Sequence, residues 1–292
     1  MDPIPAIAVF VAGLAFGSFL NVCISRIPSG LSIVTPRSHC PLCKAPIVWR
    51  DNIPVMSWVM LRRRCRNCGG SISLRYPAVE LLTAVLFLAC YFYFGIGWMT
   101  VKACVFCFLV VGLIFMDAET GYLPAEFTYP GILLGLLFAA LAPSNASGLR
   151  FVLSAFERQI TASGRLLSFI DAVSAAVLGA AFFYVAWAVY YLIRKRHGVG
   201  FGDIAMMAMI GAFLGLRLTV LVIFLAPILG TLYALFILVG PECQKAAQAD
   251  GRLLSGGVLL HEVPFGIFLG VSALIALFFG APIWNWYSGF FT

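Results

Sequence analysis

Long apolar runs separated by short polar stretches dominate the sequence. A transmembrane helix needs about 20 apolar residues in succession. Runs of this kind predict eight membrane-spanning helices, at roughly 5–25, 77–97, 99–117, 126–142, 170–193, 203–217, 219–240 and 263–287. The pattern therefore predicts an all-α polytopic membrane protein, with one long polar loop between its first and second spans.

Composition agrees with this class. Hydrophobic residues make up 62% of the chain and charged residues only 11%, whereas soluble domains are about one quarter charged. The mean hydropathy is +1.00. The formal charge of +7 does not indicate a nucleic-acid partner, because Lys and Arg in membrane proteins gather in cytoplasmic loops. The N-terminus has no basic stretch and no small-residue cleavage site, so we expect a retained helix and not a signal peptide.

The positive charges predict the orientation and the domain organisation. The loop between the first two spans holds nine of the 19 Lys and Arg residues against one acid, Asp51. This loop should therefore be cytoplasmic and the N-terminus outside. Alternation then places "RKRHGVG" (194–200) on the cytoplasmic side and the loop 143–169 outside. We expect a first transmembrane helix (1–25), a cytoplasmic loop domain (26–76) and a multi-helix membrane domain (77–292).

Two aspartates occupy corresponding places at the membrane boundary. Asp117 ends the third predicted span, and Asp203 opens the sixth; span counting puts both at the cytoplasmic side. An acid deep in a span costs roughly 2.5–3.5 kcal/mol on insertion scales and is a functional candidate for that reason. The simpler alternatives are a solvated boundary acid or, for Asp203, a helix cap. Nearby Glu119 is expected to be a solvated loop residue.

Two apposed carboxylates suggest the chemistry of an aspartyl protease. Like charges close together do not both ionise easily, so the two groups share a proton. The ionised carboxylate would act as the base on a water molecule, and the protonated one would polarise the scissile carbonyl. Gly200 and Gly202 leave the backbone bare just before Asp203, which would let a substrate backbone approach closely.

The polar loop carries two CxxC motifs. "CPLC" supplies Cys40 and Cys43, and "CRNC" supplies Cys65 and Cys68. Two such pairs at this spacing indicate zinc, and four thiolates make a closed structural site. Free or redox-active thiols are the alternative. Because so polar a loop has little core, the metal would contribute much of its folding energy.

Five stretches together resemble the bacterial type IV prepilin leader peptidases, including those that serve type II secretion pseudopilins. They are "FGSFLNVCISRIP" (16–28), the cysteine-containing stretch 40–82, "MDAETGYLP" (116–124), "GVGFGDIAMMAMIGAFLG" (198–215) and "VPFGIFLG" (263–270). The resemblance places the family's catalytic aspartates on Asp117 and Asp203 and its zinc ligands on the four loop cysteines.

The same resemblance implies two activities in the bacterial inner membrane. The first is removal of a short basic leader from prepilins or pseudopilins on the cytoplasmic side. The second is methylation of the new N-terminal amine with S-adenosylmethionine, which the family ties to the large first cytoplasmic loop.

The sequence departs from the family pattern near both motifs. Ala205 stands where the family usually has lysine after its GxGD, and Ile267 stands in place of the second proline of "PFGP". The missing lysine changes the charge near Asp203, through which it would affect the pKa of this group or the substrate preference. No glycine-rich methyl-donor motif is present, so the donor-binding residues are not identified. Glu80 is a possible participant, although an ordinary boundary acid is the simpler interpretation.

Two other functions deserve comparison with the peptidase. An ion-coupled transporter could use Asp117 and Asp203 as a relay, but it would place acids at mid-span and carry paired broken helices. A zinc-loop scaffold could dock a cytoplasmic partner, but it leaves the two aligned aspartates without a purpose.

Overall fold

The computed structural model describes residues 3–143, 164–195, 200–239 and 264–289. These residues form helices and loops, and they contain no strand beyond two isolated β-bridges. The long helices are α1 (Pro3–Arg26), α3 (Arg75–Phe94), α4 (Trp98–Thr120), α5 (Ala125–Leu141), α7 (Gly164–Arg194), α8 (Phe201–Leu214), α9 (Leu216–Val239) and α11 (Phe265–Ser288). The polar loop between α1 and α3 holds a 3-10 helix, η1 (Trp49–Asn52), and a short helix, α2 (Met56–Met60).

Eight apolar helices stand where the sequence predicted eight membrane-spanning helices. Six of them are long and apolar enough to cross a membrane, and α5 and α8 are shorter apolar helices. Several boundaries differ from those predicted, most clearly those of α7 and α8. Helix α7 begins at Gly164, inside the loop predicted for 143–169, and the rest of that loop (144–163) lies outside the described residues. Helix α8 has only 14 residues and is separated from α9 by the single residue Gly215.

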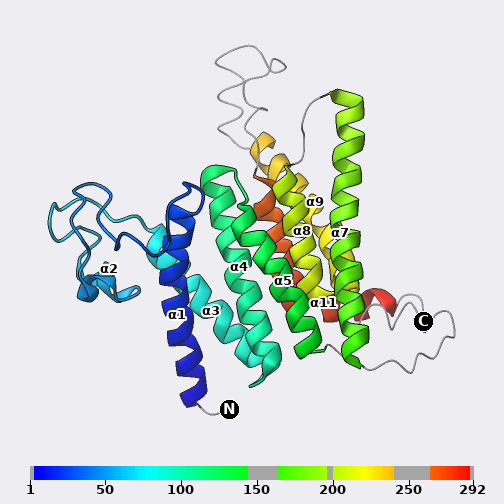
Figure 1. Ribbon diagram of the computed structural model, residues 1–292, viewed down its shortest axis with the longest axis horizontal. Coiled ribbons are helices and arrows are strands. Elements are labelled where there is room, and N and C mark those ends of the chain that lie inside the picture. The colour runs from blue at the N-terminus through cyan, green and yellow to red at the C-terminus, as the bar shows by residue number, and fades with distance from the viewer. Residues whose placement is uncertain (1–2, 144–163, 196–199, 240–263, 290–292) are drawn as a thin grey trace.

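The helices form a bundle in which α8 is central (Figure 1). Helix α8 packs against α5 and α7, α11 packs against α9 and α4, and α1 packs mainly on α3. Met206, Met207, Met209 and Ile210 of α8 are all fully buried. Gly211 of α8 lies so close to α7 that a Cβ there would be 2.6 Å from the carbonyl oxygen of Ala175. A helix covered on every side has no polar face, which explains why α8 is apolar all round.

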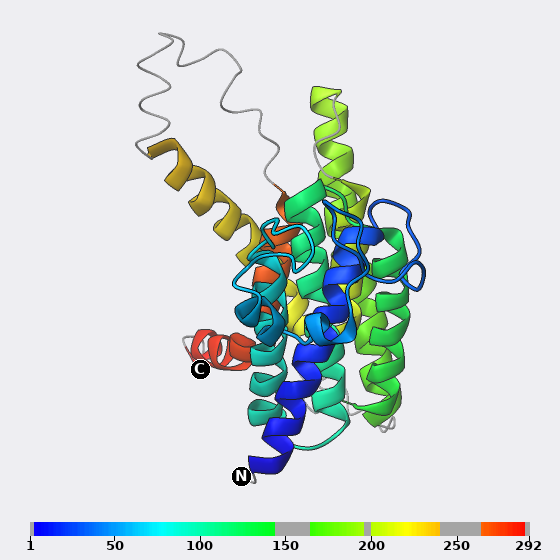
Figure 2. The ribbon, with the colours of Figure 1, turned by 90° about the vertical axis from the view of Figure 1, so that its left-hand side faces the viewer.

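The functional residues gather at one end of this bundle. The C-terminal end of α4 and the N-terminal ends of α8 and α11 lie together at the upper end of Figure 1. The polar loop lies at the same end, beside α1 and α3, as the side view shows (Figure 2).

Helices α1 and α3 are held unusually close by two glycines. A Cβ on Gly13 would lie 2.5 Å from Cα of Ala84, and one on Gly17 would lie 2.6 Å from Cα of Glu80. This is the close approach that small residues four apart allow in membrane helices. The position of Glu80 on α3 is therefore tied directly to α1.

Candidate functional site

Asp117 and Asp203 lie near each other at the end of the bundle where α4 ends and α8 begins. Asp117 lies in the last turn of α4 and Asp203 in the first turn of α8. The two side chains are close enough to interact electrostatically, and both are buried, with 5% and 8% of their surfaces exposed. Neither carboxylate forms an ion pair with any residue that the structure describes. The structure thus brings together the two acids that span counting placed at one depth.

A third helix end supports Asp117. Its Oδ2 accepts a hydrogen bond of 3.2 Å from the backbone N–H of Ile267, in the first turn of α11. A Cβ at Gly266 would lie 2.7 Å from the same oxygen, so only glycine lets the helix approach this closely. Unpaired N–H groups and the helix dipole make a helix N-terminus favourable for a carboxylate.

Asp203 is held by the start of its own helix. Its Oδ2 accepts a hydrogen bond of 3.1 Å from the N–H of Gly200. Gly200 is the N-cap residue of α8 and Asp203 is the third residue of the helix, so Asp203 caps the helix start from inside the first turn and not as the N-cap itself. Gly202 packs against Leu123, since a Cβ there would lie 2.7 Å from the Leu123 Cβ. Gly200 is exposed. Of the two glycines predicted to admit a substrate backbone, one is therefore covered by a side chain and one is open.

The four loop cysteines form a group that could hold a metal ion. Their Sγ atoms all lie within 4.8 Å of one another, and those of Cys40 and Cys68 are 3.9 Å apart. Zinc–sulfur bonds of about 2.3 Å in a tetrahedron would separate the sulfurs by about 3.8 Å. None of the four forms a disulfide. The set Cys40, Cys43, Cys65 and Cys68 therefore fits a closed four-thiolate centre.

The two CxxC segments have the same backbone structure. In each, the first cysteine donates its N–H to the carbonyl five residues later, at 2.9 Å in "CPLC" and 2.8 Å in "CRNC". Lys44 and Gly69 are the equivalent next residues and have positive φ angles of 59° and 70°. Backbone N–H groups directed at the sulfurs lower the pKa of Cys40 and of Cys43, which favours the thiolate form that binds metal. Hydrogen bonding among the cysteines raises the pKa of Cys68 to about 11.

Two ion pairs fix the surroundings of this centre. Asp51 accepts two hydrogen bonds from Arg66, at 2.8 Å and 2.7 Å, and this pairing lowers the pKa of Asp51. Glu119 pairs with Arg75 at the start of α3. Glu119 is exposed, as predicted, but the prediction that it lies in a loop was wrong, because α4 continues through Thr120 and the Glu119 carboxylate joins this helix to α3.

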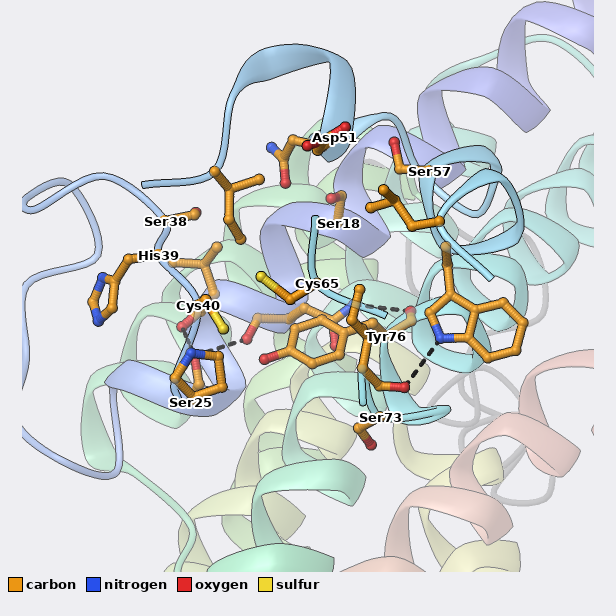
Figure 3. Close-up of a pocket in the computed structure, with 18 of the residues that line it drawn as sticks. Ser18, Ser25, Ser38, His39, Cys40, Asp51, Ser57, Cys65, Ser73 and Tyr76 are labelled. Atoms are coloured by element: carbon orange, nitrogen blue, oxygen red, sulfur yellow. Dashed lines mark hydrogen bonds between the residues drawn. The ribbon is translucent and has the colours of Figure 1, made fainter. Parts of the chain in front are cut away.

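A cavity of about 900 Å³ lies between the polar loop and the ends of α1 and α3 (Figure 3). Glu80 lines it and is buried, so it is not an ordinary solvated boundary acid. Sequence reasoning had only weak signals for this cavity and for the contacts of Gly266 and Ile267 with Asp117. The Pro-Phe-Gly sequence at the start of α11 indicated a helix that begins with an uncovered backbone. It did not indicate which side chain would lie against that backbone.

The comparisons with known proteins cover most of the chain. The profile of the Bacterial Peptidase A24 N-terminal domain matches residues 11–94, and that of the Type IV leader peptidase family matches residues 104–235. A protein of Myxococcus xanthus (strain DK1622), named prepilin leader peptidase/N-methyltransferase, is 40% identical over 240 residues, which span 81% of this chain and 64% of that protein.

Proteins of the same name from Aeromonas hydrophila and Neisseria gonorrhoeae are 32% and 30% identical. Their alignments cover 96% and 98% of this chain and 92% and 96% of the relatives. No solved structure matches the chain.

Proposed function

The chain belongs to the type IV leader peptidase family, and we propose that it is a prepilin leader peptidase/N-methyltransferase whose peptidase site is Asp117 and Asp203. The observation that carries this proposal is the proximity of two buried carboxylates at one end of the bundle, close enough to interact electrostatically and without an ion-pair partner among the described residues. The same end carries the polar loop.

The two carboxylates act as one acid–base unit. The ionised one takes a proton from a water molecule, whose oxygen attacks the scissile carbonyl carbon, while the protonated one donates its proton to the carbonyl oxygen. The C–N bond then breaks, and the leaving amine takes a proton from the pair. Because the groups titrate together, no fixed role is assigned to either.

The hydrogen bonds of the two aspartates orient them for this work. Asp117 is fixed by the N–H of Ile267 and Asp203 by the N–H of Gly200. Each bond uses Oδ2. Gly200, which is exposed next to Asp203, is the place where we expect the substrate backbone to approach.

The four loop cysteines are proposed to hold a structural zinc ion. The equal turns of the two CxxC segments and the sulfur separations fit four thiolates around one ion. A closed site of this kind has no open position for a catalytic water. The ion would stabilise residues 26–76, which we propose as a separate cytoplasmic domain between the first helix (1–25) and the membrane domain (77–292).

The membrane orientation follows from charge. Nine of the 19 basic residues lie in the loop between α1 and α3, so we propose that this loop and the two aspartates face the cytoplasm, in the bacterial inner membrane. A prepilin or pseudopilin is a hydrophobic helix behind a basic leader. Its scissile bond would then emerge from the bilayer at the depth of the two aspartates.

Mass spectrometry of a prepilin incubated with membranes containing the enzyme and S-adenosylmethionine tests the proposal. We expect a product that lacks its leader and is heavier by one methyl group. Cleavage without the added methyl group would contradict the proposed methyl-transfer activity and support the proposed peptidase activity. An intact precursor, together with proton-coupled uptake that requires Asp117 and Asp203, would favour the transporter.

A further inference from the structure

The cavity of about 900 Å³ joins the metal centre to the membrane helices (Figure 3). Cys40 and Cys65 of the polar loop line it on one side, and Tyr76 of α3 lies beside them. Its volume falls within the roughly 300–1,000 Å³ typical of small-molecule sites. The cavity is therefore large enough for a ligand and has one wall whose shape depends on the four cysteines.

Three carboxylates line this cavity, and only one of them has no cation. Asp51 is paired with Arg66, and Glu119 is paired with Arg75. Glu80 is buried, with 7% of its surface exposed, and it forms no ion pair with a described residue. Glu80 accepts hydrogen bonds from the backbone of Val55 and the side chain of Ser18, but no cation balances its charge. A buried carboxylate without a counter-charge is costly, so the cavity is suited to a ligand that brings positive charge.

The backbone opposite Glu80 is strained. Glu80 Oε2 accepts a hydrogen bond of 2.7 Å from the N–H of Val55. Val55 has φ 59° and ψ −49°, and the backbone nitrogen of Met56 lies 2.5 Å from the carbonyl oxygen of Pro54. This is the rare, strained form of the γ-turn, at a β-branched residue. Strain of this kind persists where surrounding structure imposes it, and it concentrates at binding and active sites.

Two polar atoms on the cavity wall also have no partner among the described residues. The side-chain Oδ1 of Asn21 and the Nε of Arg75 are buried without a hydrogen bond. Asn21 is 3% exposed, and its Nδ2 donates to the Tyr76 carbonyl at 3.0 Å. Asn21 Oδ1 would accept a hydrogen bond from an ammonium group, and Arg75 Nε would donate one to a carboxylate. Together they suit a zwitterionic ligand such as an amino acid derivative.

We propose that this cavity binds S-adenosylmethionine and that Glu80 binds its positively charged sulfonium. The inference rests on the proposed methyltransferase activity and names its donor site. In the transfer, the lone pair of the substrate amine forms the new N–C bond, the C–S bond breaks with its electrons passing to sulfur, and the methylated amine releases a proton to water. The sulfonium carries the charge that Glu80 would balance before the transfer.

The position of the cavity relative to the peptidase site suits a two-step enzyme. Asp117 and Glu119 both lie in the last turn of α4. Asp117 contacts the start of α11, whereas Glu119 lines the cavity. The two sites therefore lie on different sides of one helix end, and the amine that forms at the first is released close to the second.

Isothermal titration of the purified full-length protein with S-adenosylmethionine tests the site. S-adenosylhomocysteine, which lacks the sulfonium, and sinefungin, which carries an amine in its place, serve as comparison ligands. Glu80→Gln removes the charge and keeps an oxygen that can accept from Val55. Glu126→Gln is the matched control, because Glu126 is exposed on α5 and does not line the cavity. Cleavage of a prepilin by each preparation reports whether it is folded.

We expect Glu80→Gln to weaken binding of S-adenosylmethionine and sinefungin by roughly 10–100-fold, with little change for S-adenosylhomocysteine. Glu126→Gln should bind all three like the wild type. Equal weakening for all three ligands would overturn the sulfonium assignment. Binding that Glu80→Gln leaves unchanged, in protein that still cleaves, would overturn the role of Glu80.

A second variant protects the test against a folding failure. Ser25→Trp places a large side chain at the cavity wall, on an exposed position of α1, and should block the donor in protein that still cleaves. Retained binding in this variant would overturn the cavity as the site. If the wild type cleaves but neither binds the donor nor methylates, the proposed methyltransferase activity has failed, which is a separate result.

Discussion

The carboxylate of Asp117 and the backbone N–H of Ile267 are joined by a hydrogen bond of 3.2 Å across 150 residues of sequence. The bond places the start of α11 against the end of α4, beside Asp203 of α8. The family pattern has proline at this position, and proline has no N–H to donate. In this chain Ile267 therefore gives Asp117 a partner that a proline could not provide.

Substitution of either aspartate should stop cleavage. Asp117→Asn and Asp203→Asn keep the size of the side chain but remove the proton acceptor, and general acid–base groups contribute roughly 10²–10⁴-fold to rate. We expect prepilin cleavage in purified membranes to fall by at least about 100-fold in both variants. Glu126→Gln, an exposed acid on α5, is the control. Full activity in either asparagine variant would show that the pair is not the catalytic unit.

Gly266→Ala should impair cleavage through the position of Asp117. The added Cβ would lie 2.7 Å from Asp117 Oδ2 and 3.0 Å from its Cγ, so the carboxylate or α11 has to move. A displacement of about 1 Å in a catalytic group costs on the order of 100-fold in rate. Gly230→Ala is the matched control, since its Cβ would meet its nearest atom at an ordinary 3.7 Å.

The two glycine variants are compared by the initial rate of prepilin cleavage at equal amounts of folded protein. Equal rates for both would mean that α11 does not position Asp117.

Loss of one loop cysteine should separate the two activities. Cys40→Ser removes one of four thiolates, and its bound zinc should fall from about one ion per chain to near zero, measured by inductively coupled plasma mass spectrometry. Methylation should then be lost more completely than cleavage, because Cys40 lines the cavity and the aspartates lie on other elements. Cys104→Ser, in α4, is the control and should keep the metal. Undiminished zinc in Cys40→Ser would contradict the four-thiolate centre.

The sequence predicted those features of the fold and the site that depend on the local pattern of residues. Runs of apolar residues predicted the eight helices, and alternation of those spans was enough to place Asp117 and Asp203 at one end. The spacing of the cysteines predicted their cluster. Each of these features needs only the period of the pattern or the count of spans, so no knowledge of packing was required.

Features that depend on how distant helices pack were not predicted. The contact of Asp117 with Ile267 and the burial of Glu80 beneath the polar loop follow from tertiary structure alone. Gly202 illustrates the limit, because a glycine beside a candidate catalytic residue suggested access, whereas the structure shows it packed on Leu123. A glycine in a sequence motif indicates where the backbone has no side chain, but it does not indicate which group packs against it in the folded protein.

Gly17→Leu should damage the methyl-donor cavity more than the peptidase site. A side chain at Gly17 would collide with the α3 backbone at Glu80, whose Cα lies 2.6 Å from the position of an added Cβ. Helix α1 would have to move away from α3, which widens the cavity and shifts Glu80 relative to Val55. Asp117 and Asp203 lie on α4 and α8, and the backbone N–H groups that hold their carboxylates belong to Ile267 and Gly200, not to α1.

Ala15→Leu is the matched control for this variant, since Ala15 is exposed on the same helix. One reaction with a prepilin and S-adenosylmethionine, followed by mass spectrometry, measures both activities. We expect Gly17→Leu to give mainly cleaved and unmethylated product, and Ala15→Leu to give cleaved and methylated product. If Gly17→Leu lost both activities equally while remaining folded, the close contact of α1 and α3 would serve the whole bundle and not the cavity in particular.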